Sequence, residues 1–109
     1  MTGAAGRIGS AFRWHVGDRY ALRLADRTTG PIEAIARPDD EAILLDVADP
    51  EACQAACTGI YTVLHLAADP SPAADFYGSL LNNNIKGAYN IFRAAKDQGC
   101  QRVMFASSV

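Results

Sequence analysis

The stretch that decides the fold lies at the start of the chain, where residues 2–9 read Thr2-Gly3-Ala4-Ala5-Gly6-Arg7-Ile8-Gly9. Its glycines follow the spacing G-x-x-G-x-x-G and lead into apolar residues at helical spacing, Ile8, Phe12 and Val16. In a strand-to-helix turn, the first glycine permits the tight bend, the second admits a pyrophosphate, and the third lets the helix pack closely on a sheet. The free amides of the first helical turn then favour an anion. An ordinary turn before a helix is the alternative interpretation.

Beyond this loop, short apolar runs alternate with helix-like segments. Strands are predicted at 20–25, 42–45, 60–66 and 102–106, and helices at about 8–16, 50–58 and from 76 to the glycine at 99. The second helix has a clear start, because Asp49 is a good N-cap and Pro50 suits the first helical position. The stretch 27–40 is predicted to be mostly loop. Helices that connect apolar strands predict a parallel sheet covered on both faces, a doubly wound α/β fold.

Length and composition exclude several classes of protein. The chain has 109 residues and 11.6 kDa, which is enough for one small domain. Its net charge of −2 is scattered and forms no basic patch, so nucleic acid is not an expected partner. No apolar run approaches the ~18 residues of a membrane span, and no secretory signal is visible. Three cysteines, an odd count, favour reduced thiols in a cytoplasmic protein.

Asp26 ends the predicted strand 20–25, about 20 residues beyond the glycine loop. A carboxylate at this place can accept hydrogen bonds from the hydroxyls of an adenosine ribose, and it repels a 2′-phosphate. It therefore favours NAD over NADP, although Arg27 directly after it offers a partner for a 2′-phosphate and leaves NADP open. The alternative is a loop carboxylate at the end of a strand.

The sequence resembles a known family, the extended short-chain dehydrogenase/reductases, also called the NAD-dependent epimerase/dehydratase family. Residues 2–9 resemble its TGxxGxxG loop, and four later segments resemble its other motifs in the same order: Asp46-Val47, His65-Leu66-Ala67-Ala68, the N-x-x-G-x-x-N helix within Asn83–Asn90, and Val103–Ser108. Within the family, the Phe-Ala-Ser-Ser ending and the helix around Gly87 look most like uronate dehydrogenases and related sugar oxidoreductases.

The resemblance implies roles for individual residues. The pyrophosphate is expected on Gly3, Gly6, Arg7, Ile8 and Gly9; the ribose on Asp26 and Arg27; the adenine on Asp46 and Val47; and the path to the nicotinamide ribose along Leu66, Ala67 and Ala68. Asn84 is expected to steady the active site. Ser108 is expected to be the catalytic serine that hydrogen-bonds the substrate oxygen, with Ser107 as the alternative.

Two departures from the family pattern accompany these matches. None of the tyrosines at positions 20, 61, 77 and 89 has a lysine four residues later, so the Tyr-x-x-x-Lys acid/base pair is not in this sequence. Only Met1 precedes the Thr-Gly pair, so the strands at 20–25 and 60–66 are expected to lose their shared neighbour and leave backbone groups unpaired. The hypothesis is a partial dinucleotide-binding domain over residues 1–109, incomplete at both ends of a Rossmann-type fold.

The resemblance thus implies the cofactor-binding part of an NAD(P)-dependent oxidoreductase, epimerase or dehydratase acting on a sugar or sugar nucleotide. This chain alone is expected to bind the dinucleotide weakly and to catalyse nothing. Its partners would be the dinucleotide, a sugar-type substrate in the complete enzyme and, as one option, a second copy of the chain. A non-catalytic NAD(P)-sensing regulatory or scaffold protein of the same fold is the alternative, and an α/β domain without a ligand is a third.

Several polar and thiol side chains are also candidates for metal binding, catalysis or contact with a cofactor. Cys53 and Cys57 share a helix face, but no further ligands lie at suitable spacing, so they are predicted to be small buried residues and no metal site is expected. His65 is predicted to be a packed strand histidine, and a catalytic base is the alternative. The pair Asp39-Asp40 is expected to be solvated. The asparagines at 82–84 are poor helix formers, which indicates side chains that reach for a cofactor, water or backbone.

Overall fold

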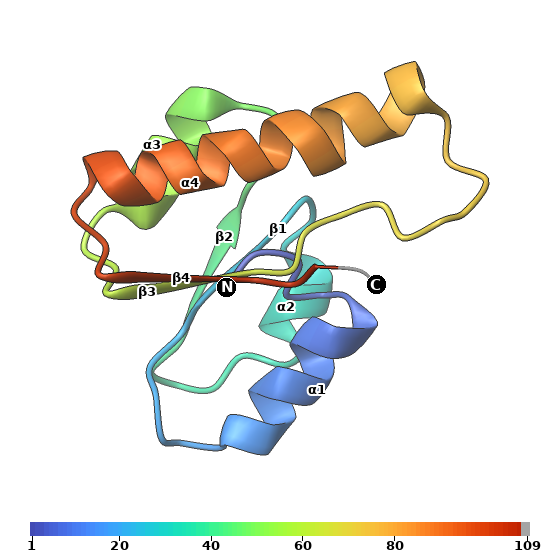
Figure 1. The fold of residues 1–109 in the computed structure, drawn as a ribbon. Coiled ribbons are helices and arrows are strands. Elements are labelled where there is room, and N and C mark those ends of the chain that lie inside the picture. The colour runs from blue at the N-terminus through green and yellow to red at the C-terminus, as the bar shows by residue number, and fades with distance from the viewer. Residues whose placement is uncertain (108–109) are drawn as a thin grey trace.

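The computed structural model describes residues 1–107 and places parallel strands between two layers of helices (Figure 1). In chain order the elements are α1 Arg7–Val16, β1 Arg23–Asp26, α2 Gly30–Glu33, β2 Glu41–Leu44, α3 Pro50–Cys57, β3 Thr62–His65, η1 Phe76–Lys86, α4 Gly87–Asp97 and β4 Arg102–Phe105. η1 is wound as a π-helix and runs directly into α4. Among residues 1–107, no helix is long and apolar enough to cross a lipid bilayer.

The strands lie in the order β2-β1 and β3-β4, and both pairs are parallel. Thr2 lies between the two pairs and bridges to Ala25 of β1 and His65 of β3. The amide of Ala25 donates to the carbonyl of Met1 at 2.9 Å, and the amide of Thr2 donates to the carbonyl of Leu64 at 3.0 Å. The prediction that these strands lose their shared neighbour is therefore wrong at this level of the sheet, because Met1 and Thr2 occupy the central position.

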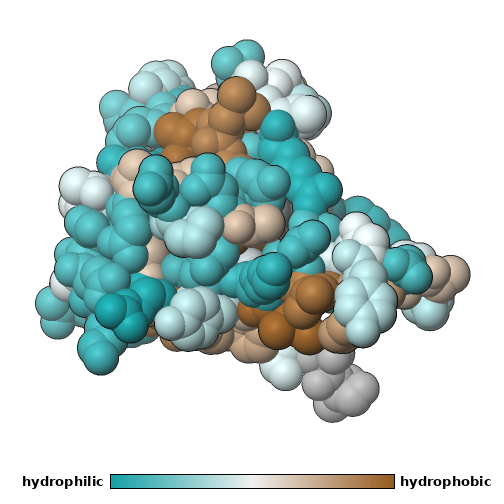
Figure 2. All heavy atoms as spheres, turned by 90° about the horizontal axis from the view of Figure 1, so that it is seen from above, coloured by the Kyte–Doolittle hydropathy of each residue, from teal (hydrophilic) through white to brown (hydrophobic). Residues whose placement is uncertain are grey.

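Helices cover both faces of the strands. In Figure 1, α3 and the continuous η1–α4 helix lie above the strands, and α1 and α2 lie below them. The predicted doubly wound α/β fold is confirmed. The outer surface of the α3–α4 layer is mostly hydrophilic, with hydrophobic atoms gathered in two separate places (Figure 2), as expected for a layer whose apolar side faces the sheet.

Each helix layer encloses its own hydrophobic core. The core beneath α3 and α4 is the larger of the two and includes Leu45, Val47, Cys53, Val63 and Ile91. The core beneath α1 and α2 is formed by Ala4, Leu24 and Ile32.

Cys53 and Cys57 lie inside the larger core, as predicted. They are 0% and 3% exposed, and burial raises the pKa of the Cys53 thiol to about 12 and that of the Cys57 thiol to about 11. Both side chains therefore act as small apolar residues.

The stretch 27–40 is mostly loop, as predicted, and also contains the short helix α2, which has Pro31 in its first turn. Two other local expectations differ from the structure. Ile8 is 67% exposed, and α1 buries Gly9, Arg13 and Val16 instead. Asp40, expected to be solvated, has a side chain only 1% exposed, because it pairs with Arg13 at 3.2 Å. The ion pair explains why Arg13 and Asp40 are buried together, since a buried arginine requires a buried carboxylate beside it.

Candidate functional site

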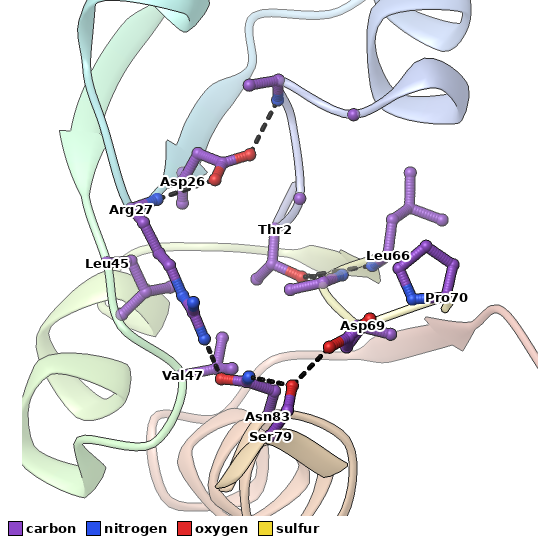
Figure 3. Close-up of a pocket in the computed structure, with 16 residues that line it drawn as sticks. Thr2, Asp26, Arg27, Leu45, Val47, Leu66, Asp69, Pro70, Ser79 and Asn83 are labelled. Atoms are coloured by element: carbon purple, nitrogen blue, oxygen red, sulfur yellow. Dashed lines mark hydrogen bonds between the residues drawn. The ribbon is translucent and has the colours of Figure 1, made fainter. Parts of the chain in front are cut away.

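A cavity of about 450 Å³ opens where β1 and β3 end, on either side of Thr2 (Figure 3). This is the place where the strand order reverses direction, and open α/β sheets bind ligands at such a switch point. The lining residues come from the glycine loop and from the segments after β1, β2 and β3, together with two η1 side chains: Thr2, Gly3, Ala5, Gly6, Ala25, Asp26, Arg27, Leu45, Val47, Leu66, Ala67, Ala68, Asp69, Pro70, Ser79 and Asn83.

The glycine loop lies directly against the segment after β3. Gly3 has a φ of +65°, and a Cβ there would lie 2.8 Å from the nitrogen of Ala67 and from the carbonyl carbon of Leu66. Only glycine fits this backbone conformation and this close approach. On the other side, the amide of Ala4 donates to the carbonyl of Ala25 at 3.2 Å. The loop is therefore held by both halves of the sheet.

The first turn of α1 is open to an anion. No side chain caps the helix at Gly6, and its first turn contains no acidic residue. Within residues 1–107, the backbone amides of positions 7–9 have no hydrogen-bond acceptor. These free N–H groups lie next to Gly6, a lining residue, and together with the helix dipole they favour negative charge. The side chains of Arg7 and Ile8 are exposed and do not line the cavity, and neither does Gly9.

Asp26 lies in the cavity wall and holds two backbone amides. Its Oδ2 accepts from the amide of Ala5 at 2.9 Å, and its Oδ1 accepts from the amide of Arg27 at 2.7 Å. A carboxylate has about four acceptor positions, so the two oxygens can each accept a further hydrogen bond. The carboxylate thus fixes the glycine loop and remains available to hydroxyl groups in the cavity.

A chain of hydrogen-bonded polar side chains lies along one side of the cavity. Arg27 donates to Oδ1 of Asn83, whose Nδ2 donates to Oγ of Ser79 at 3.1 Å, and Ser79 donates to Oδ2 of Asp69 (Figure 3). The Ser79 hydroxyl is the main cause that lowers the pKa of the Asp69 carboxyl. Arg27 also borders a second cavity of about 600 Å³, whose wall includes Asp46. Asp46 and Val47 therefore border different cavities.

The N-x-x-G-x-x-N motif, which spans the end of η1 and the start of α4, supports the cavity walls without lining the cavity. Asn84 lies outside the lining, but its Oδ1 accepts from the amide of Asp69 at 2.7 Å and its Nδ2 donates to the carbonyl of Asp69 at 3.1 Å. Asn90 donates to the carbonyl of Val47 at 2.8 Å. A Cβ on Gly87 would lie 2.6 Å from Cγ2 of Val47, so glycine allows α4 to approach this wall closely. Of the asparagines at 82–84, Asn84 reaches for backbone, as the sequence indicated, whereas Asn83 bonds the side chains of Arg27 and Ser79.

Sequence reasoning assigned no role in this site to Thr2, Ser79, Asp69 or Asn90. Each contacts a partner that is distant in sequence, so local patterns alone give no signal of the contact. Thr2 and Asn90 do belong to motifs that the sequence resembles. Ser108, the expected catalytic residue, lies outside the described residues, whereas Ser107 is described and follows β4.

His65 is buried at the end of β3, with 2% exposure, as predicted for a packed strand histidine. Its Nδ1 lies 2.7 Å from Oγ1 of Thr2, and its ring stacks on Phe105 with the centroids 5.8 Å apart. Burial is the main cause that lowers its pKa to about 4, and the positive charge of the Met1 ammonium adds to this shift.

This lowered pKa predicts a loss of stability in mild acid. Above pH 6.5, His65 is neutral in both the folded and the unfolded chain. As the pH falls from 6.5 towards 4, His65 becomes protonated in the unfolded chain but stays neutral in the folded chain. The free energy of unfolding should therefore decrease by about 3 kcal/mol. Urea unfolding at a series of pH values measures this. His65→Phe is the control and should lack this part of the pH dependence; an equal slope in both proteins contradicts the assignment.

Fold and site together define a Rossmann-type α/β domain with an anion-receptive glycine loop at its switch point. Comparison with known proteins agrees. The model of the NAD dependent epimerase/dehydratase family matches residues 1–109, so the chain belongs to that family.

Individual relatives match nearly the whole chain. It is 44% identical to an NAD-dependent glucose-6-phosphate dehydrogenase of Haloferax volcanii, over 99% of this chain and 42% of that protein. It is 33% identical to a uronate dehydrogenase of Pseudomonas putida, over 99% of this chain and 39% of that protein. Among solved structures, a mutant uronate dehydrogenase from Agrobacterium tumefaciens complexed with NAD has a TM-score of 0.85 and 37% identity, over 98% of this chain and 39% of that one. The chain thus spans about two-fifths of the length of these relatives.

Proposed function

We propose that residues 1–109 form the greater part of a dinucleotide-binding domain that takes NAD, within an oxidoreductase that moves a hydride to or from a sugar-type substrate. The observation that carries the proposal is the uncapped start of α1 beside a cavity at the switch point of the sheet. The position of Gly6, the second glycine of the loop, in the cavity lining supports it as well, since glycine at this place lets the backbone approach a diphosphate. When bound, NAD supplies the hydride-accepting centre.

The residues of the chain have distinct tasks in this proposal. The free amides of positions 7–9 bind the diphosphate, and the carboxylate of Asp26 accepts from the ribose hydroxyls. Val47 and Leu66 offer apolar walls on either side of the cavity and exclude water from it. Asn84 acts by holding the backbone of Asp69.

We propose NAD as the preferred cofactor over NADP. The carboxylate of Asp26 repels a 2′-phosphate, and the guanidinium of Arg27, the cation nearest to it in sequence, is turned towards Asn83. Binding of NADP would need Arg27 to leave Asn83 and to balance the charge of Asp26.

For the complete enzyme we propose a sugar or sugar derivative as substrate, supported by the relatives' names as a glucose-6-phosphate dehydrogenase and a uronate dehydrogenase. We assign the hydrogen bond to the reacting substrate oxygen to Ser108, with Ser107 as the alternative. Support comes from β4, which precedes both serines and runs parallel to β3 towards the edge of the sheet where the cavity opens. We also propose a cytoplasmic location, because the three cysteines are free thiols.

Isothermal titration of the chain with NAD and with NADP tests the cofactor proposal. The unsubstituted chain should bind NAD more tightly than NADP, and Asp26→Ala should weaken NAD binding at least about tenfold, because charged hydrogen bonds to the ribose and to Ala5 are lost. Asp39→Ala is the matched control, since Asp39 is an exposed aspartate outside the cavity. A preference for NADP, or an unchanged affinity of Asp26→Ala for NAD, would overturn the assignment.

A further inference from the structure

Three hydrogen-bonding groups surround the hydroxyl of Thr2. The amides of Leu66 and Ala67 each lie 3.1 Å from Oγ1, and Nδ1 of His65 lies 2.7 Å from it. A hydroxyl has two acceptor lone pairs and one proton. Both amides can only donate, so they take the lone pairs, and the hydroxyl proton must point to Nδ1. His65 is therefore the acceptor in this contact and carries its own ring proton on Nε2.

This arrangement sets the hydroxyl in one orientation. The His65 ring is buried and stacked on Phe105, so it presents Nδ1 to Thr2 in a fixed direction. Because the Thr2 hydroxyl donates to Nδ1, the lone pairs of its oxygen point to the two amides of the segment after β3. That segment forms the cavity wall opposite Asp26, and the glycine loop lies between the two walls (Figure 3).

The contact matters because the glycine loop and this wall approach each other closely. The backbone of Gly3 leaves no room for a Cβ against the Leu66–Ala67 peptide. The hydroxyl of the neighbouring Thr2 binds both amides that follow His65. The separation between the loop and the wall therefore depends on the Thr2 oxygen, whose two lone pairs are both available to the amides only while Nδ1 of His65 carries no proton and accepts from the hydroxyl.

We propose that His65 is a positioning residue of the dinucleotide site and acts through Thr2. Its Nδ1 accepts a hydrogen bond from the Thr2 hydroxyl instead of donating one, so both lone pairs of the oxygen hold the amides of Leu66 and Ala67 and fix the wall of the cavity against the glycine loop. The ligand in this inference is the dinucleotide of the proposed function, on which the inference rests.

The test compares variants that separate ring packing from proton acceptance. His65→Phe retains an aromatic ring against Phe105 but removes the acceptor, whereas His65→Asn removes the ring but retains an acceptor oxygen. Thr2→Val removes the hydroxyl, and Thr2→Ser retains it. Circular dichroism establishes that each variant is folded. The readouts are the 15N shifts of the His65 ring, amide hydrogen exchange at Leu66 and Ala67, and NAD affinity by titration.

We expect the ring shifts of the Nε2–H neutral tautomer in the chain without ligand. His65→Phe should speed exchange at the two amides and weaken NAD binding about fivefold, the effect of one hydrogen bond. His65→Asn should recover part of both losses, and Thr2→Ser should bind NAD more tightly than Thr2→Val. Because His65 acts through Thr2, the double variant should bind NAD no more weakly than Thr2→Val alone.

A proton on Nδ1, unchanged amide exchange in His65→Phe, or additive losses in the double variant would each overturn the inference. The tautomer and the exchange rates are measured without NAD. If the unsubstituted chain fails to bind NAD, the proposed function fails on that result alone, and these two measurements still decide whether His65 orients Thr2.

Discussion

Gly9→Ala should remove most of the NAD affinity of the chain. A Cβ at this position would lie 2.5 Å from the carbonyl oxygen of Gly3 and 2.8 Å from the Cα and carbonyl oxygen of Ala4. All three atoms belong to the backbone, so no side chain can move aside, and α1 must shift away from the loop that supports its first turn. We expect the free energy of unfolding to fall by about 2–3 kcal/mol. NAD affinity should fall at least about thirtyfold, measured by titration calorimetry.

Gly30→Ala is the matched control for this change. Gly30 begins α2, and a Cβ there would meet nothing within 4 Å. The substitution should leave NAD binding unchanged, because Gly30 lies outside the cavity. If Gly9→Ala bound NAD as tightly as the unsubstituted chain, the close contact between α1 and the glycine loop would have no part in the site.

Arg13→Met should destabilise the fold strongly, and far more than the same substitution of an arginine in a surface ion pair. Arg13 and Asp40 form a buried ion pair, with side chains 2% and 1% exposed. The Asp40 carboxylate also accepts from the amides of Leu22 and Arg37, both at 2.9 Å, and cannot leave its place without breaking these bonds. Removing the arginine leaves a buried charge without a counter-ion, which costs about 3–5 kcal/mol. Urea unfolding followed by circular dichroism measures the loss.

The surface pair of Arg93 and Asp97 provides the control. Its nitrogen and oxygen lie 3.0 Å apart on one face of α4, and the two side chains are 58% and 37% exposed. Arg93→Met should therefore leave the unfolding midpoint within experimental error, because exposed pairs gain little over hydration. Equal effects of the two substitutions would show that burial of the Arg13 pair contributes nothing to the stability of the fold.

The sequence predicted best what depends on neighbouring residues. The start of α3 is one example, since Asp49 accepts from the amides of Glu51 and Ala52 within a single helical turn. The glycine loop is another, because its bend and the start of α1 follow from glycine spacing within residues 2–9. The parallel direction of the strands also followed from local signals, since helical crossovers between apolar strands restrict the sheet to a parallel arrangement.

Contacts between distant residues could not be predicted in this way. Arg13 and Asp40 are 27 residues apart, and Thr2 and His65 are 63 residues apart. A charged residue in an amphipathic pattern is ordinarily assigned to the solvent face, so the burial of Arg13 becomes intelligible only once its partner is known. The central role of Met1 and Thr2 in the sheet was missed for a similar reason, because two residues are too few to show a strand pattern.

The buried thiols of Cys53 and Cys57 have a practical consequence. Alkylating and oxidising reagents attack the thiolate, and burial, which raises the pKa of the Cys53 thiol to about 12, keeps this side chain protonated near neutral pH. Both sulfur atoms are also shielded from reagents by the core around them. Alkylation at these two positions therefore follows the opening of the core and makes them internal reporters of unfolding.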